Sequence, residues 1–468
     1  MYKAYVTVLT NVRKHPNADR LLLADVFGNT VCVSTDYTEG QLGVYFPTDG
    51  QLSVEFAEKN NLVRKKDDAG NNIGGYLEPD KRNIRAIRLR GEKSDGIFLP
   101  ISCLNYCYEH RDASLELFAG DVIDGLVNGH EICQKYIPRT QNRVGRVTEG
   151  NKTRKARPSV SPLFKEHADT EQLAYNLGAF KPGDHIEVSL KLHGTSQRTG
   201  YLPVFKGYKR TFWDWLLRRQ GTPVYDYGYV SGTRRVVLEN YEGGFYGNNE
   251  FREQHSKTFE GKLWKGETVY YEVVGFTTSG QPIMGDASNK KLNDKEFVKQ
   301  YGETTRFSYA CSPFGRGIPA PQSTIYVYRM TMTNPDGEVV EYTPDFMRYR
   351  CEQMAVKCVP VFWNGFIPET NEALYVDKND NGECDEGETA YVKPIDAGEW
   401  VRELAECYYD GPDPIGKTHV REGVVVRIIN RPKFCAYKHK NFSFKVLEGI
   451  IKDTASTPDM EEAQDVIE

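Results

Sequence analysis

The segment Ser189–Ser196, with the sequence S-L-K-L-H-G-T-S, constrains the fold more than any other stretch of the chain. It is predicted to be the end of a β-strand that brings Lys191 to a turn at Gly194. A lysine that faces a glycine turn can act as a covalent nucleophile. Four-residue patterns such as K-x-H-G recur by chance, so the segment gains its meaning from the segments that follow it.

Three further strand-like segments follow in order: Tyr271–Gly275 (Y-E-V-V-G), Arg421–Val426 (R-E-G-V-V-V) and Tyr437–Lys440 (Y-K-H-K). As an ordered set, the four segments resemble the motifs of the covalent nucleotidyltransferases, which are the polynucleotide ligases and RNA capping enzymes. Within that superfamily the chain is similar to ATP-dependent RNA ligases of the nick-sealing type, which carry an N-terminal OB-fold module. The motif set spans residues 189–449.

The resemblance implies a reaction in three steps. Lys191 takes AMP from ATP, releases pyrophosphate and forms a lysyl–AMP phosphoramide. AMP then passes to a 5′-phosphate end, and a 3′-hydroxyl attacks this activated end and expels AMP. The attacking amine must be neutral, whereas a free lysine has a pKa near ~10.4. Nearby positive charge favours a neutral amine, and the resemblance gives that role to Lys438, Lys440 and a bound Mg²⁺ or Mn²⁺.

The same resemblance supplies the other site residues. The expected catalytic residues are Lys191, Glu272, Glu422, Lys438 and Lys440. Glu272 is expected to contact the ribose hydroxyls or the metal, and Glu422 the metal, because Mg²⁺ prefers oxygen ligands. For either glutamate alone, the alternative is a surface residue of a strand. The expected ATP contacts are Lys191, Leu192, His193, Gly194, Arg198, Arg234, Glu272, Tyr328, Lys438 and Lys440.

Three of these assignments carry alternatives. Arg234, with Arg235 as the second choice, is expected to grip a phosphate bidentately. Tyr328 corresponds best to the aromatic residue that stacks on adenine in the family, and the alternative is a tyrosine in the core of a strand. Family members often have aspartate after that aromatic residue, where this chain has Arg329.

His193 stands where K-x-D-G motifs have aspartate. Some RNA ligases share this histidine, so it favours an RNA ligase over a DNA ligase. DNA ligases and capping enzymes also carry an OB domain after the last lysine motif. Only 28 residues follow Lys440 in the 468-residue chain, which is too short for such a domain. This argues against a capping enzyme and against an ordinary DNA ligase.

Residues 1–135 are predicted to form a β-rich unit, because short apolar runs alternate with turns such as Asp49-Gly50. This spacing suggests a small barrel. The segments His15–Leu21 and Arg90–Ile97 resemble the OB-fold tRNA-binding module, and the alternative is that they only stabilise turns. Basic residues that would support RNA binding are Lys81, Arg82, Arg85, Arg88 and Arg90.

The expected architecture is α+β. An N-terminal OB-fold barrel at 1–135 precedes a basic linker at 136–160, an adenylyltransferase domain at 161–452 and an acidic tail at 453–468. In the adenylyltransferase domain we expect antiparallel sheets flanked by helices.

Two segments and one histidine of the second domain can each be interpreted in more than one way. Basic and aromatic residues mix in 206–219, where we expect a helix whose aromatic side chains pack on the domain; nucleic-acid binding is the alternative. Asp377–Glu388 matches a calcium-loop pattern, although strand-like flanks favour a metal-free hairpin tip. His167 is expected to be a polar residue of the surface.

Composition limits the partners. The net charge of −5 means that any nucleic-acid surface must be local, and no apolar run approaches the ~18 residues of a membrane helix. Ten cysteines without a C-x-x-C pair indicate reduced thiols in a cytoplasmic protein. We expect a monomer that binds ATP and RNA and joins RNA ends at nicks. The alternatives are a DNA-joining ligase and an RNA- or tRNA-binding protein with an inactive transferase domain.

Overall fold

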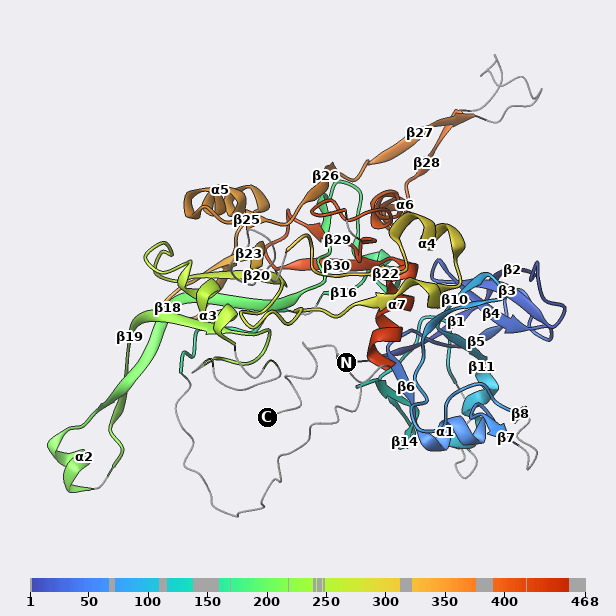
Figure 1. Cartoon of the computed structure of the whole chain (residues 1–468), viewed down its shortest axis with the longest axis horizontal. Helices are drawn as coiled ribbons and strands as arrows, with labels where there is room; N and C mark the ends of the chain where they lie inside the picture. Colours follow the sequence, from blue (N-terminus) through green and yellow to red (C-terminus); the bar gives the residue numbers. More distant parts are fainter. Residues whose placement is uncertain are drawn as a thin grey trace. The chain divides into compact units, whose positions relative to one another are not determined.

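The computed structural model divides into two compact units (Figure 1). The first contains Met1–Gln141, Asp286–Thr305 and Phe442–Pro458, and the second contains Asn142–Gly285, Arg306–Asn441 and Asp459–Glu468. The structure describes residues 2–66, 72–108, 116–137, 160–168, 170–217, 219–238, 241, 246, 249–311, 322–375, 390–417 and 419–453. Most of the predicted basic linker, the loop Asp377–Glu388 and the tail beyond Asp453 therefore lie outside the described residues.

Short antiparallel strands build most of the first unit. They form a four-stranded sheet in the order β11-β5-β1-β12, a three-stranded sheet in the order β2-β3-β4, and two-stranded ladders. The strands are β1 (Ala4–Val8), β2 (Thr10–Lys14), β3 (Leu21–Val26), β4 (Asn29–Ser34), β5 (Leu42–Phe46), β6 (Gly50–Leu52), β7 (Lys65–Lys66), β8 (Asn72–Gly74), β9 (Ala86–Leu89), β10 (Glu92–Asp95), β11 (Ile97–Pro100), β12 (Val122–Ile123), β13 (Leu126–Val127), β14 (His130–Glu131), β15 (Cys133–Lys135), β21 (Ala287–Ser288) and β22 (Thr304–Thr305).

No pairing among these described strands closes a sheet into a barrel. The expected β-rich character is therefore found in the described part of the unit, whereas the expected closed barrel is not. Alternating residues of the central strands, such as Val6 and Val44, are fully buried in one core together with Phe46 and Phe56. The helices of this unit are α1 (Val54–Lys59), α4 (Lys295–Tyr301) and α7 (Phe442–Asp453), with 3-10 helices at Ile101–Tyr108 and Asn289–Leu292.

The two segments that resemble the tRNA-binding module, which contain His15 and Arg90, are hydrogen-bonded to each other. His15 Nε2 donates to the Leu89 carbonyl at 3.1 Å, and Asn17 Nδ2 donates to the Arg90 carbonyl at 3.0 Å. Arg90 and Gly91 both have positive φ, at 46° and 97°, and form a sharp turn. Asn17 binds this turn through the Arg90 carbonyl. These contacts give the segments a structural role in this unit.

Two helical segments from distant parts of the sequence belong to the first unit. Asp294 caps α4 by accepting from the Phe297 amide at 3.0 Å, and it also pairs with Arg88 at 3.0 Å. Lys445 of α7 pairs with the buried Asp95 at 2.5 Å. These ion pairs fasten both helices to the β9–β10 hairpin.

The second unit contains two larger sheets. One has the order β16-β30-β29-β17-β26, and the other has the order β19-β18-β20-β23-β24 with β25 beside β23. The strands are β16 (Glu171–Gln172), β17 (His185–Leu190), β18 (Thr195–Lys209), β19 (Thr222–Gly232), β20 (Glu267–Gly275), β23 (Ser323–Thr333), β24 (Val339–Glu341), β25 (Lys357–Cys358), β26 (Val361–Phe366), β27 (Thr370–Tyr375), β28 (Ala390–Pro394), β29 (Gly423–Ile428) and β30 (Cys435–Lys440). Apart from the parallel pairs β16–β30 and β23–β25, the pairings in these sheets are antiparallel.

The helices of this unit are α2 (Phe212–Leu216), α3 (Glu250–Lys257), α5 (Pro344–Met354) and α6 (Ala397–Tyr409), with 3-10 turns at Leu173–Tyr175 and Leu177–Ala179. Helices α3, α5 and α6 flank the sheets, as predicted. Val401 and Ala405 of α6 pack in one buried cluster with Val424 and Val426 of β29. The mixed α+β class with antiparallel sheets is therefore confirmed for the described residues.

The predicted packing of the 206–219 segment is wrong. Strands β18 and β19 extend as a long hairpin, and α2 lies at its tip (Figure 1). Phe212, Trp213 and Trp215 are 69%, 66% and 66% exposed, so these aromatic side chains do not pack on the domain.

Across the residues that the structure describes, we find no helix long and apolar enough to cross a membrane.

Candidate active site

The site is built where the two sheets of the second unit are joined by the Lys191–Gly194 turn. Leu190, the last residue of β17, pairs with Val424 of β29, and the Lys191 amide donates to the Gly423 carbonyl at 3.0 Å. These backbone bonds bring the Lys191 side chain to Glu422, which directly precedes β29. The Lys191 Nζ and Glu422 Oε1 atoms are 2.8 Å apart.

Glu422 receives a second cation from the neighbouring strand. In the β29–β30 ladder Gly423 lies opposite Lys440, and Lys440 Nζ is 3.3 Å from the same Glu422 Oε1 atom. The glutamate side chain is only 2% exposed. A buried carboxylate is costly unless it is paired, and here two ammonium groups share that role.

Lys438 lies on the same face of β30 as Lys440, because side chains two residues apart point to the same side of a strand. His439, between them, points the other way and packs on the Tyr409 ring of α6 at 4.9 Å. The expected cationic pair Lys438 and Lys440 therefore lies on the face of β30 opposite α6.

Glu272 reaches the turn from the other sheet. It lies on β20 between Ser196 of β18 and Tyr326 of β23. A Cβ atom on Gly194 would come within 2.8 Å of Glu272 Cγ and 2.5 Å of the Val273 carbonyl oxygen. Only glycine therefore lets the Lys191 turn approach β20 this closely.

A buried tyrosine, Tyr309, lies beside the lysine turn. The His193 amide donates to its hydroxyl oxygen at 2.8 Å. Burial raises the pKa of Tyr309 well above its usual value, and the negative charges of Glu422, Asp413 and Glu272 raise it further. Both predicted metal ligands thus act electrostatically on one hydroxyl group next to the lysine turn.

Sequence reasoning missed Tyr309, because its segment carries no motif. Tyr309 and Ala310 have φ values of 48° and 61°, a left-handed pair that L-residues rarely adopt. The His419 ring packs edge-on against Tyr309 at 4.4 Å, and burial lowers the pKa of His419. This neutral histidine supports the tyrosine without adding charge to the site.

The carboxylates suit a divalent cation. Glu422 Oε2 is buried and has no hydrogen bond within the described part of the chain, although His193 Nδ1 lies 3.8 Å away. No group of three or more His, Cys, Asp or Glu side chains in the described residues could hold a metal by itself. Mg²⁺ is usually held by one or two carboxylates together with waters and substrate phosphates, so Glu422 and Glu272 fit such an ion.

Tyr328 lies on β23 and reaches the start of β18. Its hydroxyl shares a hydrogen bond with Ser196 Oγ at 2.9 Å. Its ring also contacts His167, with ring centres 5.2 Å apart. Stacking of Tyr328 on adenine remains a prediction.

The prediction that His167 is a surface residue is wrong. Its half-buried ring contacts three aromatic rings, those of Tyr270, Tyr328 and Phe434. Arg329 Nη1 donates to His167 Nδ1 at 3.1 Å. Burial lowers the pKa of His167 well below its usual value, and the charges of Arg329, Arg234 and Arg198 lower it further. His167 is therefore neutral, and no pattern in the sequence marks it.

Arg329 stands where the family often has aspartate, and it is buried. It pairs with Glu341 and stacks on the rings of Tyr270 and Phe434, at 4.6 and 4.5 Å. These contacts compensate the charge of Arg329, and its ion pair with Glu341 links β23 to β24.

Arg198 is also buried and makes structural contacts. Its guanidinium lies 4.4 Å from the centre of the Phe164 ring, and Nη1 donates to the Arg234 carbonyl at 2.9 Å. Burial lowers the pKa of Arg198. Arg198 thus holds the backbone of Arg234, the residue predicted to bind a phosphate.

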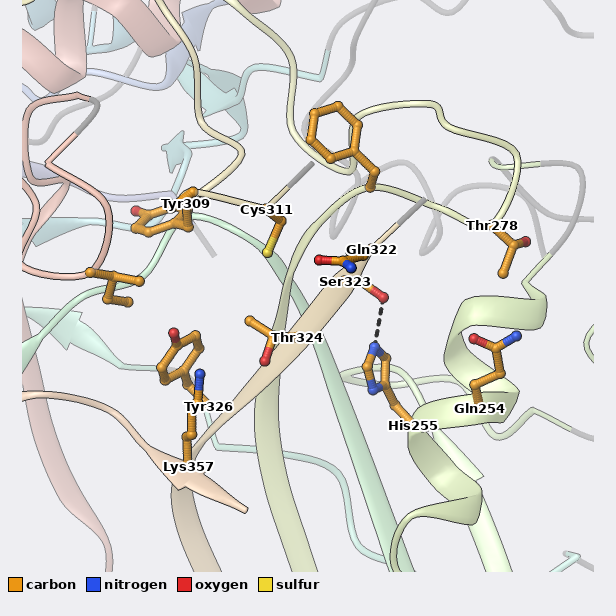
Figure 2. Close-up of a pocket in the computed structure, with 13 residues that line it drawn as sticks. Gln254, His255, Thr278, Tyr309, Cys311, Gln322, Ser323, Thr324, Tyr326 and Lys357 are labelled. Carbon is orange, nitrogen blue, oxygen red and sulfur yellow. Dashed lines mark hydrogen bonds between the residues drawn. The ribbon is translucent and has the colours of Figure 1, made fainter. Parts of the chain in front are cut away.

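A cavity of about 530 Å³ adjoins the site. Tyr309 and Tyr326 line it together with Lys357, whose Nζ lies 5.7 Å from the centre of the Tyr326 ring. Figure 2 shows Lys357 and Tyr326 across this cavity from His255 of α3, which hydrogen-bonds Ser323 Oγ at 2.7 Å. Tyr326 lies directly across from Glu272 in the sheet, so the cavity borders the predicted catalytic face.

Comparison with known proteins finds a match in fold and none in sequence. No protein-family model matches the sequence, and no curated protein matches it. Among solved structures, the chain is similar to the Naegleria gruberi RNA ligase with PPi, at a TM-score of 0.51 and 15% identity over 94% of this chain and 97% of that chain. A mutant of that ligase with AMP and Mn gives the same four values.

A second mutant of the Naegleria gruberi RNA ligase, with ATP and Mn, gives a TM-score of 0.50 and 16% identity over 94% of this chain and 98% of that chain. Identities this low carry information about the fold and not about activity. The described chain therefore has a mixed α+β fold that resembles the fold of these RNA ligase structures.

Proposed function

We propose that this chain is an ATP-dependent RNA ligase that joins a 3′-hydroxyl end to a 5′-phosphate end at RNA-containing nicks. The observation that carries the proposal is the Glu422 carboxylate, which binds Lys191 and Lys440 at 2.8 and 3.3 Å. Segments from three of the four ordered motifs thus meet at the Lys191 amine, and the fourth, with Glu272, lies against the same turn at Gly194. The fold of the chain resembles that of RNA ligases.

In the first step, Lys191 Nζ attacks the α-phosphorus of ATP. An N–P bond forms, the bond from the α-phosphorus to the bridging oxygen breaks, and pyrophosphate leaves. The amine must lose a proton to solvent before the attack, and the positive charge of Lys438 and Lys440 is proposed to favour its neutral form.

Lys438 and Lys440 are proposed to neutralise the phosphate oxygens, since positive charge near a reacting phosphate stabilises the transition state. Glu422 and Glu272 would hold Mg²⁺ or Mn²⁺, which supplies further charge stabilisation on the phosphates when bound. The turn residues Leu192, His193 and Gly194 would line the nucleotide, with Arg234 and Arg198 toward a phosphate and Tyr328 toward adenine.

In the later steps, AMP passes from Lys191 to the 5′-phosphate of the RNA, breaking the N–P bond and forming a pyrophosphate linkage. The 3′-hydroxyl then attacks the activated 5′-phosphorus and AMP leaves. Positioning of the two ends supplies much of the rate in such transfers.

Two alternatives keep the same fold. A DNA-joining ligase would use the same site, although His193 in place of aspartate favours RNA. An RNA- or tRNA-binding protein with an inactive transferase domain would not need Lys191, Lys440 and Glu422 together. The first unit is proposed to bind RNA, and the protein is proposed to be a cytoplasmic monomer.

A labelling assay tests the proposal. The protein is first stripped of bound AMP with pyrophosphate and then mixed with α-labelled ATP and Mg²⁺ or Mn²⁺. We expect label on the denatured wild-type protein and on Lys299→Ala, which removes an exposed lysine of α4, and none on Lys191→Ala. An unlabelled wild type would refute the ligase and leave the RNA-binding alternative.

Nicked duplexes then identify the substrate. Sealing that requires a ribose rather than a deoxyribose at the 3′-hydroxyl side of the nick supports an RNA ligase, because the 2′-hydroxyl distinguishes the two. Equal sealing of both nicks would favour the DNA-joining alternative.

A further inference from the structure

A long two-stranded ribbon leaves the sheet that carries Glu272. Strand β18 spans 15 residues and pairs with β19 from Arg198↔Gly232 out to Lys209↔Thr222. On its other side β18 pairs with β20 only as far as Gly200. Beyond Gly200, β18 has β19 as its one strand partner within the described part of the chain, and the ribbon ends at α2 (Figure 1).

The tip of the ribbon exposes a cluster of large aromatic side chains. The Phe212 ring contacts Trp213 at 5.9 Å and Trp215 at 6.0 Å, and both tryptophans lie within the tip itself. Thr211 and Asp214 form a reciprocal cap that holds this turn of helix. An exposed apolar cluster of this kind marks an interaction site.

Aromatic residues continue from the tip along one face of the ribbon. Tyr229 stacks on Tyr201 with ring centres 4.7 Å apart, and Tyr225 contacts Phe205 at 5.8 Å. Tyr227 lies between them in sequence, on the same face because side chains alternate along a strand. All five rings are half-buried, so each retains exposed surface.

The charge of the ribbon is positive. Its exposed basic residues are Lys206, Lys209, Arg210 and Arg219, and within the described residues none of them forms an ion pair. Two acids lie on the ribbon. The pKa of Asp214 is lowered by hydrogen bonds from the Thr211 hydroxyl and amide and by the charges of Arg219 and Arg210, and Asp226 is exposed on β19. Basic residues nevertheless outnumber acids on the ribbon, and Lys209, Arg210 and Arg219 place positive charge around its aromatic tip.

We propose that this aromatic arm, defined as residues 201–217 and 219–229, is a track for a single-stranded segment of the RNA substrate. Bases would stack on the tyrosine, phenylalanine and tryptophan rings while phosphates face the lysine and arginine side chains, which is how single strands are held without sequence preference. The proposal rests on the proposed ligase function, because it names the surface that holds that enzyme's substrate.

The layout of the arm favours RNA over a lipid surface. A membrane would engage only the exposed tip, whereas the aromatic face continues to Tyr201, and β18 begins directly after Gly194 of the lysine turn. The 15 residues of β18 span about 50 Å at ~3.3 Å per residue. A single strand whose bases stay stacked at the ~3.4 Å rise of a duplex strand would place about 15 nucleotides along this length.

RNA length provides the test. Binding of the full chain to fluorescent single-stranded RNAs of about 20 and about 5 nucleotides is measured by anisotropy. In the variant Phe212→Ser/Trp213→Ser/Trp215→Ser, we expect about tenfold weaker binding of the long RNA and unchanged binding of the short one. Phe366→Ser is the matched control, since Phe366 is 63% exposed but lies on β26 outside the arm.

A charge variant gives a second readout. Lys209→Glu/Arg210→Glu should reduce the slope of log affinity against log salt by about 1.4, at ~0.7 for each lost phosphate contact with a single strand. Formation of lysyl–AMP from ATP serves as the folding control for both variants. An unchanged salt slope would count against the phosphate contacts.

Three outcomes overturn the proposal. The wild type and the tip variant could bind the long RNA equally well, or the tip variant could lose the same affinity for both RNA lengths. The tip variant could also keep its RNA affinity but lose binding to anionic phospholipid vesicles or lose self-association. Absence of lysyl–AMP in the wild type would instead defeat the ligase function. In that case, a length-dependent loss in the tip variant would still support the arm.

Discussion

At the scale of single residues, the chemistry depends on a carboxylate that has more than one partner. Glu422 neutralises Lys191 and Lys440 in this structure, and the same side chain is proposed to hold a divalent cation during the reaction. A buried carboxylate can exchange partners only if each alternative also compensates its charge. In the proposed reaction, the two ammonium groups would therefore compensate the charge of Glu422 until ATP and the metal bind.

A buried histidine predicts how stability depends on pH. Burial lowers the pKa of His255 to about 4, whereas the unfolded value is ~6.5. Between these values the unfolded chain binds more protons than the folded chain, so stability falls as pH falls from about 6.5 toward 4. The slope from this histidine is at most ~1.4 kcal/mol per pH unit.

The variant His255→Gln checks this slope. Glutamine does not titrate and can still hydrogen-bond Ser323, so the free energy of unfolding should depend less on pH below about 6.5. Denaturant titrations at several pH values, followed by tryptophan fluorescence, measure the difference. A variant with the same pH slope as the wild type would contradict the prediction.

At the scale of elements, a buried ion pair docks α5 on the strand that carries Glu272. Arg350 of α5 donates to both carboxylate oxygens of Glu267, at 2.8 and 2.7 Å, and both side chains are almost fully buried. The Tyr342 hydroxyl and the Trp264 amide add two more hydrogen bonds to the same carboxylate. These bonds position the start of β20, five residues before Glu272.

Replacing one partner of this pair should be costly. Arg350→Met leaves the Glu267 carboxylate buried without its cation, and we expect the free energy of unfolding to drop by about 3–5 kcal/mol. The double variant Glu267→Gln/Arg350→Met should recover most of this loss, because no buried charge remains. Tryptophan fluorescence measures the unfolding of the second unit, which contains this ion pair, since all five tryptophans belong to that unit. A single variant as stable as the wild type would refute the argument.

At the scale of the whole molecule, the chain passes more than once between the two units. Residues 286–305 and 442–453 belong to the first unit although the sequence that precedes each segment belongs to the second. Phe444 and Leu447 of α7 are fully buried, and Lys445 pairs with Asp95. The first unit is therefore assembled from segments of three parts of the sequence.

This organisation predicts the result of a simple truncation. Removing residues 1–135 should give a protein that aggregates, because α7 would lose its contacts with β9 and its ion pair with Asp95 and would expose apolar surface. The same truncation with Phe444→Ser/Leu447→Ser should stay soluble by comparison. Size-exclusion chromatography with light scattering distinguishes the two, and a monodisperse truncated wild type would show that α7 does not depend on the first unit.

Local patterns in the sequence were enough to predict some features. Strand alternation and turn residues act over a few neighbours, so the β-rich character of the first unit was predictable and is found. The antiparallel sheets of the second unit were expected from the resemblance of its motifs to the nucleotidyltransferases, and they are found as well. The four motifs and their order could also be recognised in the sequence, because each motif is short and contiguous. The proposed roles of Lys191, Glu272 and Glu422 follow from that order and await experiment.

Long-range packing decided the rest. Closure of strands into a barrel depends on pairings between distant residues, and the described strands of the first unit do not close in that way. Whether the aromatic side chains of 206–219 pack or project could not be derived from their spacing, because it depends on how far the hairpin extends beyond its sheet. Burial of His167, the left-handed turn at Tyr309 and the return of α7 to the first unit likewise arise from contacts between residues far apart in sequence.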